Sequence, residues 1–298
     1  MTSRLSVALA TCAGWPDLDE DGPVLRQALA DEGVTTTILA WDDPGVDWST
    51  FDLVLLRTTW DWWDRHEEFL AWTRRVPRLA NTAEVVAWNT DKSYLREFER
   101  AGIPVVPTTW LVPGDTFSDP GGTFVVKPSV SAGARDTAAY VGGDPAAGAH
   151  VDRLLTAGRT VMVQPYLEQV DSLGETAVLV FDGKVSHAAV KAAVLTPGSG
   201  TPALGSWQVA PREASAQEVA FALRVVKGRD LLYARVDLLP TADGPVLIEL
   251  EVTEPSLFLQ HSPASATRLA RAVRARALRP SALRPSALRP SARRPSAP

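Results

Sequence analysis

The sequence predicts an α/β domain at the start of the chain and a larger α+β module after it. Short apolar runs alternate with helical stretches over residues 1–85, and hairpin-forming runs dominate the region that follows. Alternating strands and helices are typical of a parallel sheet, whereas hairpins require antiparallel pairing. With 298 residues and 45% apolar side chains, the chain is long enough to bury more than one core.

The N-terminal α/β domain is expected over residues 1–88. Its apolar runs predict strands at Leu5–Thr11, Thr35–Trp41 and Asp52–Arg57, and helices at Pro23–Glu32 and His66–Val76. Ligands of such sheets bind beyond the carboxyl ends of the strands. Arg57 ends the third strand, so we expect it to hold a substrate carboxylate through a bidentate pair. Most tryptophans here are expected in the core, but Trp60 is expected to contact the substrate.

The α+β module begins with a helix, for which Asn89 or Thr90 is the expected cap and Gly102 the expected end. Further helices are expected at Pro145–Thr156 and Ser215–Val226. The expected strands are Val105–Leu111, Thr123–Lys127, Thr160–Gln164, Ala177–Phe181, Lys184–Lys191, Leu232–Leu238 and Val246–Val252.

The C-terminal segment, residues 277–298, repeats the letters ALRPS with a proline in each repeat. Prolines at this spacing exclude a regular helix, so we expect a disordered tail, with binding to an anionic partner as the alternative. The nine arginines from Arg268 onward leave a formal charge of about −14 on the rest of the chain. An acidic body argues against nucleic-acid binding and suits the recruitment of divalent cations.

The segment from Tyr233 to Ser256 is expected to form a β-hairpin, because two apolar runs flank a Thr-Ala-Asp-Gly turn. This turn places Asp237 opposite Glu249, and the two-residue period of a strand puts Glu251 on the same face. Three clustered carboxylates need a positive partner. Oxygen ligands without histidine or cysteine favour Mg²⁺, with Mn²⁺ as the alternative ion. The competing interpretation is an exposed acidic strand face.

Arg235 precedes Asp237 by two residues and is expected on the same face, where it would stabilise charge developing in phosphoryl transfer. A salt bridge to one of the carboxylates explains its position equally well. Glu254 lies outside the alternation of the strand, so its role stays open.

The chain has five lysines beside 25 arginines, which makes the lysine positions informative. Lys127 ends the run TFVVKP, before a loop of small residues in which Ser131 and Gly133 are candidates for substrate contact. Such a lysine and loop suit phosphate binding. Gln164 begins QPYLE, where a strand ends at proline and its backbone could bind an adenine edge; an ordinary strand exit is the alternative. Lys191 either reaches the same phosphates or lies on the surface.

Other classes of site find little support. The four histidines lack metal-binding spacing and no GxSxG motif occurs, which argues against a hydrolase. The single cysteine, Cys12, cannot form an internal disulfide, and no export signal or membrane-spanning run is visible, so we expect a cytoplasmic protein.

Taken in order, Lys92, Lys127 with its loop, VQPYLE, Lys191 and the carboxylate hairpin resemble the ATP-grasp superfamily over roughly residues 1–275. The ending IELEVTEPS is similar to that of glutathione synthetase, although Glu251 stands where that family carries an asparagine. The resemblance implies an ATP-grasp fold, in which the α/β domain precedes a central lobe at 89–165 and a C-terminal lobe at 166–276 that clasp ATP. A flexible loop at 129–136 would close as a lid.

The resemblance also implies a role for each motif residue. The nucleotide contacts would be Lys92 and Lys127 at the α- and β-phosphates, Gln164 with the backbone of Tyr166 and Leu167 at adenine, and Asp171 at the ribose. Two magnesium ions would be held by Asp237, Glu249 and Glu251. The γ-phosphate and the acyl phosphate made from it would face Arg235 and Lys191.

More narrowly, RTTWDW, WNTDKSYL, KPSVSAGARDT, VQPYLE and YARVDL look like the motifs of D-cycloserine synthetases. This resemblance implies a cyclo-ligase that activates the carboxylate of O-ureido-D-serine, so that its own ureido nitrogen closes the ring with loss of ammonia and carbon dioxide. The alternatives are a ligase that joins two molecules, such as amino acids or peptides, and a non-catalytic ATP-binding module. A small amino-acid-like substrate is the expected partner, without nucleic acid or membrane, and a homo-oligomer is left open.

Overall fold

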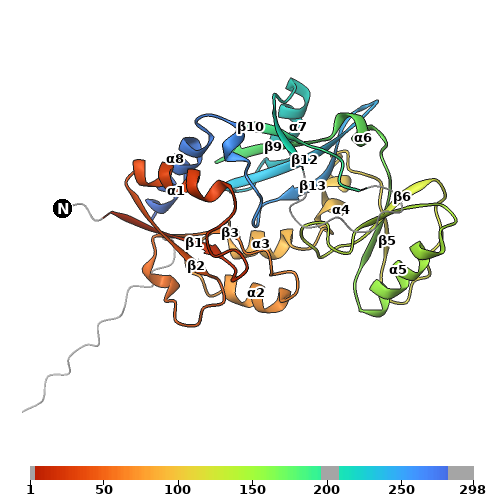
Figure 1. Ribbon diagram of the computed structural model, residues 1–298, viewed down its shortest axis with the longest axis horizontal. Helices are drawn as coiled ribbons and strands as arrows, with labels where there is room; N and C mark the ends of the chain where they lie inside the picture. The colour runs from red at the N-terminus through yellow and green to blue at the C-terminus, as the bar shows by residue number, and fades with distance from the viewer. Residues whose placement is uncertain (1–3, 196–207, 281–298) are drawn as a thin grey trace, which may run out of the picture.

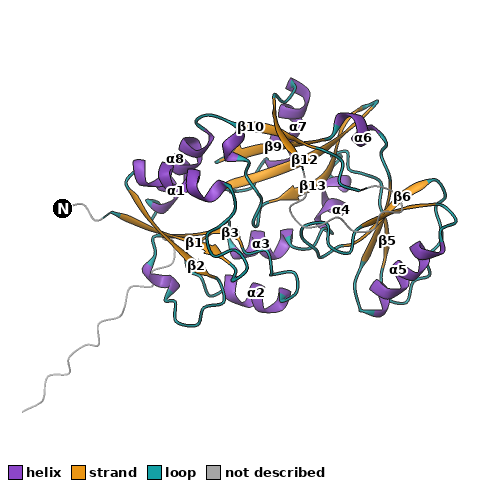
Figure 2. Cartoon of the chain, in the orientation of Figure 1, coloured by secondary structure: helices purple, strands orange, loops and turns teal. Residues whose placement is uncertain are grey.

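The computed structural model describes residues 4–195 and 208–280, and these form three sheets with flanking helices (Figures 1 and 2). The first sheet is parallel, with the strand order β2-β1-β3-β4. The predicted α/β domain with a parallel sheet is therefore confirmed. Its elements are β1 (Leu5–Thr11), α1 (Asp21–Asp31), β2 (Val34–Ala40), a 3-10 turn (Trp48–Thr50), β3 (Leu53–Thr58), α2 (His66–Thr73), β4 (Leu79–Ala80) and α3 (Ala83–Asn89).

The second sheet is antiparallel, in the order β5-β8-β6-β7, and α5 packs against it. The helix has the bounds expected from the sequence, and the Asp144 carboxylate caps it by accepting a hydrogen bond from the backbone N–H of Ala146 (2.9 Å). The elements are β5 (Thr109–Leu111), β6 (Thr123–Pro128), β7 (Ala138–Val141), α5 (Pro145–Thr156) and β8 (Val161–Pro165).

The third sheet is also antiparallel, in the order β11-β10-β9-β12-β13. One side of it packs against α4 and α7, and α7 begins with a capping box between Ser215 and Glu218. The elements are α4 (Tyr94–Arg100), α6 (Gln169–Leu173), β9 (Glu175–Phe181), β10 (Lys184–Lys191), β11 (Val209–Arg212), α7 (Ala216–Val226), β12 (Tyr233–Thr241), β13 (Gly244–Glu251), a 3-10 turn (Leu259–His261) and α8 (Ser265–Ala277).

Strand β9 is buried on both faces, which explains why its sequence is continuously apolar. Val178 and Val180 belong to the core shared with α4 and α7. Leu179 and Phe181 point the other way, into a core shared with the first sheet, α1 and α8. Helix α8 packs directly on α1 (Figure 1). The last helix of the expected C-terminal lobe therefore covers the N-terminal domain and holds the two together.

The prediction that a helix begins at Asn89 or Thr90 and runs to Gly102 is wrong at its start. Helix α3 ends at Asn89, and α4 begins only at Tyr94. The Asn89 side chain does not cap a helix, because its amide donates to the carbonyl of Leu250 (2.6 Å) and its oxygen accepts from the N–H of Val252 (3.0 Å). A tertiary contact with β13 thus overrides the local capping signal.

The expected tail lies outside the described residues from 281 onward. In the part of the chain that the structure describes, no helix combines the length and the apolar character that crossing a membrane requires.

Candidate active site

The hairpin of β12 and β13 has the register that the sequence predicted. Asp237 pairs with Glu249 and Arg235 with Glu251, and a bulge follows Asp237. Between these positions, Val236 and Leu250 are fully buried in the core beneath the sheet. The alternation therefore places the charged side chains together on the opposite face.

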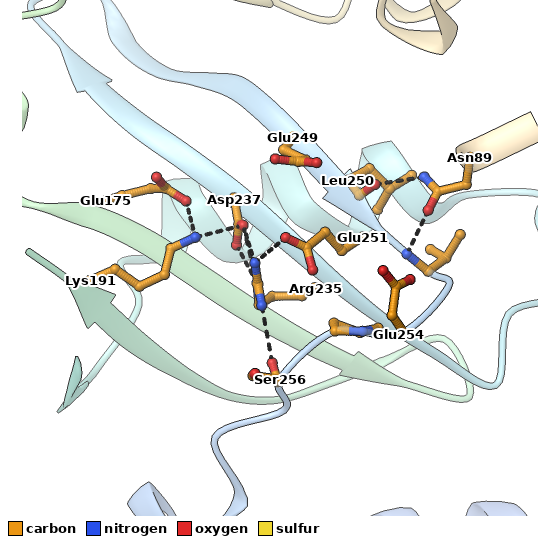
Figure 3. A network of polar contacts seen from close by, with 12 residues as sticks. Asn89, Glu175, Lys191, Arg235, Asp237, Glu249, Leu250, Glu251, Glu254 and Ser256 are labelled. Carbon is orange, nitrogen blue, oxygen red and sulfur yellow. Dashed lines mark hydrogen bonds and ion pairs between the residues drawn. The ribbon is translucent and has the colours of Figure 1, made fainter. Parts of the chain in front are cut away.

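Arg235 crosses between two of these carboxylates (Figure 3). Its guanidinium donates to Asp237 from Nε (2.9 Å) and Nη2 (2.8 Å), to Glu251 from Nη2, and to the carbonyl of Ser256 from Nη1 (3.2 Å). Burial by itself would raise the pKa of Asp237, but the charges of Arg235 and Lys191 hold that pKa below its usual range. The salt bridge that the sequence left as an alternative for Arg235 is thus present.

Lys191 joins the same network from β10. Its Nζ lies 2.8 Å from Asp237 and also pairs with Glu175, the residue opposite it in the register of β9 and β10. Burial raises the pKa of Glu175 to about 7, although Lys191 opposes this shift. Sequence reasoning missed Glu175. The two-residue turn Asp182-Gly183 alone would have paired Lys191 with Gly174, and the register shift between Val185 and His187 moves the partner to Glu175.

Lys92 and Lys127 approach from the other side of the site. The Lys92 ammonium donates to the carbonyl of Ser131 (2.7 Å) and lies 3.2 Å from the Glu249 carboxylate. Lys127 is 7% exposed, and among the described residues it has no salt bridge or hydrogen-bond acceptor for its ammonium. Burial lowers its pKa to about 8, despite the nearby charge of Glu249. A buried ammonium without a protein partner indicates a position for an anion.

A cavity of about 260 Å³ lies where the three sheets meet, and twelve of the fifteen predicted site residues line it. The cavity therefore gathers residues from segments far apart in the sequence. The twelve are Trp60, Lys92, Lys127, Ser131, Gly133, Gln164, Tyr166, Leu167, Lys191, Arg235, Glu249 and Glu251.

Three predicted residues do not line the cavity. Asp237 lies behind its wall at 1% exposure. Asp171 is just outside, where it accepts a hydrogen bond from the Tyr166 hydroxyl. Arg57 is also 1% exposed and donates to the carbonyl of Pro255 (3.2 Å), with Asp19 3.7 Å away. The structure does not bring Arg57 to the expected substrate side, because the segment after β13 covers it.

The end of β8 and the residues after it, Gln164 to Leu167, line one wall of the cavity, which we term the hinge wall. Gln164 is 3% exposed and its amide donates to the hydroxyl of Thr108 (2.8 Å). The Tyr166 hydroxyl, whose proton goes to Asp171, also lies 3.0 Å from the carbonyl oxygen of Leu195. These contacts fix the polypeptide where it passes from the second sheet to the third. Leu167 also lines the cavity, so this wall combines apolar side chains with backbone groups.

The loop at 129–136 lies against the N-terminal domain. Arg135 stacks over the ring of Trp63, 3.8 Å from its centroid, while Val130 and Ala132 pack against the tryptophan cluster. Gly133 adopts a left-handed φ of 61°, which glycine allows without strain. The loop thereby covers the lysine side of the cavity.

Glu254, whose role the sequence left open, also lines the cavity. It is 9% exposed, and its carboxylate accepts a hydrogen bond from the indole N–H of Trp62. The indole of Trp60 donates to the Glu254 backbone carbonyl (3.0 Å). The tryptophans after β3 thus hold the segment after β13.

The carboxylates offer suitable donors for magnesium, though not a preformed cluster. Glu249 and Glu251 line the cavity with side chains that are each 29% exposed, so their hard oxygens are accessible. Burial raises the pKa of Glu251 to about 8, although Arg235 beside it opposes this shift. Within residues 4–195 and 208–280, no three acidic, histidine or cysteine side chains converge on one point. The carboxylate oxygens suit Mg²⁺, but Glu249 is engaged by Lys92 and Glu251 by Arg235.

Comparisons with known proteins agree with this architecture. A family model described as the N-terminal domain of D-cycloserine synthetase DcsG matches residues 7–81. The cycloserine biosynthesis protein DcsG of Streptomyces lavendulae is 38% identical over 292 residues, which span 90% of this chain and 97% of that protein. The crystal structure of D-cycloserine synthetase DcsG matches with a TM-score of 0.82 and 37% identity, covering 91% of this chain and 99% of that one.

A more distant structure is that of the ATP-grasp ligase PsnB in complex with a precursor variant, Mg and ADP. It matches with a TM-score of 0.62 and 17% identity, covering 92% of this chain and 99% of that one. At this identity the likeness shows the fold alone. Together these matches confirm the predicted ATP-grasp fold.

Proposed function

Because the chain belongs to the DcsG family of ATP-grasp ligases, we propose that it converts O-ureido-D-serine into D-cycloserine at the expense of ATP. The observation that carries this proposal is the cavity in which buried Lys127, without an anionic partner among the described residues, lies near three further cations: Lys92, Lys191 and Arg235. Such a set of cations suits the phosphates of a nucleotide and an acyl phosphate.

The phosphates are proposed to bind along the row of cations. Lys92 and Lys127 would hold the α- and β-phosphates, and Lys92 would exchange its contact with Glu249 for a phosphate oxygen. Arg235 and Lys191 would face the γ-phosphate and then the acyl phosphate. Since their positions are set by Asp237, these two cations need little reorganisation during the transfer.

The adenine is proposed to lie against the hinge wall. Gln164, whose side chain is oriented by Thr108, and the backbone of Tyr166 and Leu167 would contact the base. Asp171 is held beside Tyr166 and would take the ribose hydroxyls from the rim of the cavity.

Two magnesium ions are proposed to bind Glu249 and Glu251, with Asp237 as the inner ligand. Magnesium would supply Lewis acidity that neutralises phosphate charge. Asp237 can contribute only if Arg235 or Lys191 yields one of its contacts, because its carboxylate is engaged with both. Ser131, Gly133 and the loop that carries them would exclude water from the acyl phosphate, and Trp60 would border the amino acid.

The chemistry then requires one substrate. The carboxylate of O-ureido-D-serine takes the γ-phosphoryl group, and the nitrogen bonded to the side-chain oxygen attacks the acyl carbon and displaces phosphate. Hydrolysis of the remaining carbamoyl group releases ammonia and carbon dioxide. The products are D-cycloserine, ADP and phosphate.

The test is an assay of ADP and cycloserine with O-ureido-D-serine as sole acceptor. Formation of both supports the proposal. ADP release only when a second amino acid is added would instead identify a ligase that joins two molecules, and binding of ATP without turnover would identify a non-catalytic module. Lys127→Met should abolish turnover, whereas the matched control Lys227→Met, at an exposed position, should not.

A further inference from the structure

We propose that Glu254, together with Trp60 and Trp62, forms a subsite for the α-ammonium group of an amino-acid substrate. This inference rests on the proposed function and adds to it a residue that recognises the free amino group. The inference gives a role to the buried carboxylate of Glu254, which takes no part in the proposed binding of phosphate or metal.

The geometry of Glu254 indicates a cationic ligand. Its side chain lines the cavity and is 9% exposed, yet among the described residues the only hydrogen bond to its carboxylate comes from the neutral indole of Trp62. No lysine, arginine or histidine in the described part of the chain forms a salt bridge with it. A buried carboxylate of this kind is costly unless a cation approaches it.

The surroundings favour an ammonium group over a metal ion. Trp60, Trp62 and Trp63 line the cavity together with Glu254, and their indole rings surround this carboxylate with groups that do not coordinate magnesium. One oxygen of Glu254 is already occupied by the indole N–H of Trp62, which leaves a single oxygen for the ligand. One carboxylate oxygen beside aromatic rings matches the size and charge of an ammonium group.

The subsite is rigid and lies on the side of the cavity formed by the N-terminal domain. Trp62 stacks on Phe69 (6.0 Å between centroids), which fixes its ring. Asn89 holds the backbone of Val252 and the hydroxyl of Thr253, just before Glu254. Gln164 belongs to β8 of the second sheet, whereas Glu254 is held by tryptophans of the N-terminal domain, so adenine at Gln164 would leave Glu254 to the amino acid.

The decisive variant is Glu254→Gln, which keeps an acceptor for Trp62 but removes the charge. The matched control is Glu97→Gln, because exposed Glu97 also accepts a hydrogen bond from a tryptophan, Trp88 (3.1 Å), outside the cavity. A charge-assisted hydrogen bond contributes about 1.5–3 kcal/mol, so Glu254→Gln should raise the KM for O-ureido-D-serine about 10- to 100-fold. The KM for ATP should not change, and the control should behave as the unmodified protein.

A second measurement keeps this test independent of turnover. Calorimetry in the presence of ADP and Mg²⁺ compares D-serine with D-glycerate, which has a hydroxyl in place of the amino group. We expect the unmodified protein to prefer D-serine and Glu254→Gln to lose that preference. If preference is lost but O-ureido-D-serine is not cyclised, the proposed function fails and the subsite stands.

Three results would overturn the subsite. One is an unchanged KM for O-ureido-D-serine in Glu254→Gln. Another is an equal loss of affinity for D-serine and D-glycerate, which would mean that Glu254 only supports the structure. The last is an absence of any preference for D-serine in the unmodified protein.

Discussion

Replacing Arg57 by methionine should destabilise the protein far more than it weakens substrate binding. The guanidinium is 1% exposed, and each of its pairs with Asp19 and Asp21 spans 3.7 Å. At an effective dielectric constant of about 20, one such pair is worth about 4 to 5 kcal/mol before desolvation is subtracted. Removing one partner of a buried pair costs about 3–5 kcal/mol, because the remaining charge stays buried. Arg57→Met should therefore lower the free energy of unfolding by that amount.

Without Arg57, the carboxylate left without a compensating partner would mainly be that of Asp19. Asp21 accepts hydrogen bonds from the backbone N–H groups of Leu257 and Leu259 (both 2.6 Å), whereas one oxygen of Asp19 is buried without a partner among the described residues. Burial already raises the pKa of Asp19 to about 6, although Arg57 opposes this shift. The double variant Arg57→Met with Asp19→Asn should therefore recover part of the lost stability.

Urea unfolding of the single and double variants measures these free energies, and an ADP-release assay gives the KM. Arg26→Met is the matched control, because Arg26 is exposed on α1, and it should change stability by less than about 0.5 kcal/mol. The opposite result would be a nearly unchanged free energy of unfolding for Arg57→Met together with a steep rise in the KM for the carboxylate substrate. Arg57 would then contact the substrate, and the structural argument would be wrong.

Three further predictions concern carboxylates of the site. Glu249→Gln should lower turnover about 100-fold or more while leaving the urea midpoint nearly unchanged, because it removes a proposed metal ligand; retained Mg²⁺-dependent activity would contradict this. Glu175→Gln should lower kcat more than it raises the KM for ATP, because Lys191 loses one of two carboxylate partners; equal effects on both constants would contradict it. Burial raises the pKa of Glu254 from 4.5 to about 7, so its ionised form opposes folding. The free energy of unfolding of the unmodified protein, measured relative to that of Glu254→Gln, should therefore fall by up to about 3 kcal/mol between pH 4.5 and 7 and stay constant above pH 7. Urea titrations of both proteins at several pH values measure this difference, and a difference that does not change with pH would disprove the prediction.

The sequence predicted the parts of the site that local rules determine. The turn and the two-residue period place Asp237 and Glu249 near each other, but their direct pairing also needs the bulge after Asp237, since the turn alone would set Asp237 opposite Ile248. Strand ends are local as well, so Arg57 was correctly placed at the end of β3. Its burial was not predictable, since Pro255, nearly 200 residues away, supplies the carbonyl that covers it.

Asn89 and Glu175 show the same limit. The cap expected at Asn89 was a sound local interpretation, but two backbone groups of the β13 segment compete for its amide, and this competition depends on the tertiary fold. Glu175 carries no motif, and its importance comes only from the strand beside it. The roles proposed for the individual site residues remain predictions that the variants above can test.

The balance of charge explains why metal and nucleotide should need each other. Four cationic and four carboxylate side chains of the described residues line the cavity, and Asp237 adds one negative charge behind its wall. A nucleotide alone would bring several phosphate charges to a site where, of the three lysines that line the cavity, only Lys127 lacks an acidic partner among the described residues. A nucleotide neutralised by magnesium adds no such charge, and a zwitterionic amino acid adds none either. Magnesium bound by Glu249 and Glu251 would thus compensate these carboxylates while Lys92 turns to phosphate, and the nucleotide would give Lys127 the anionic partner that it lacks among the described residues.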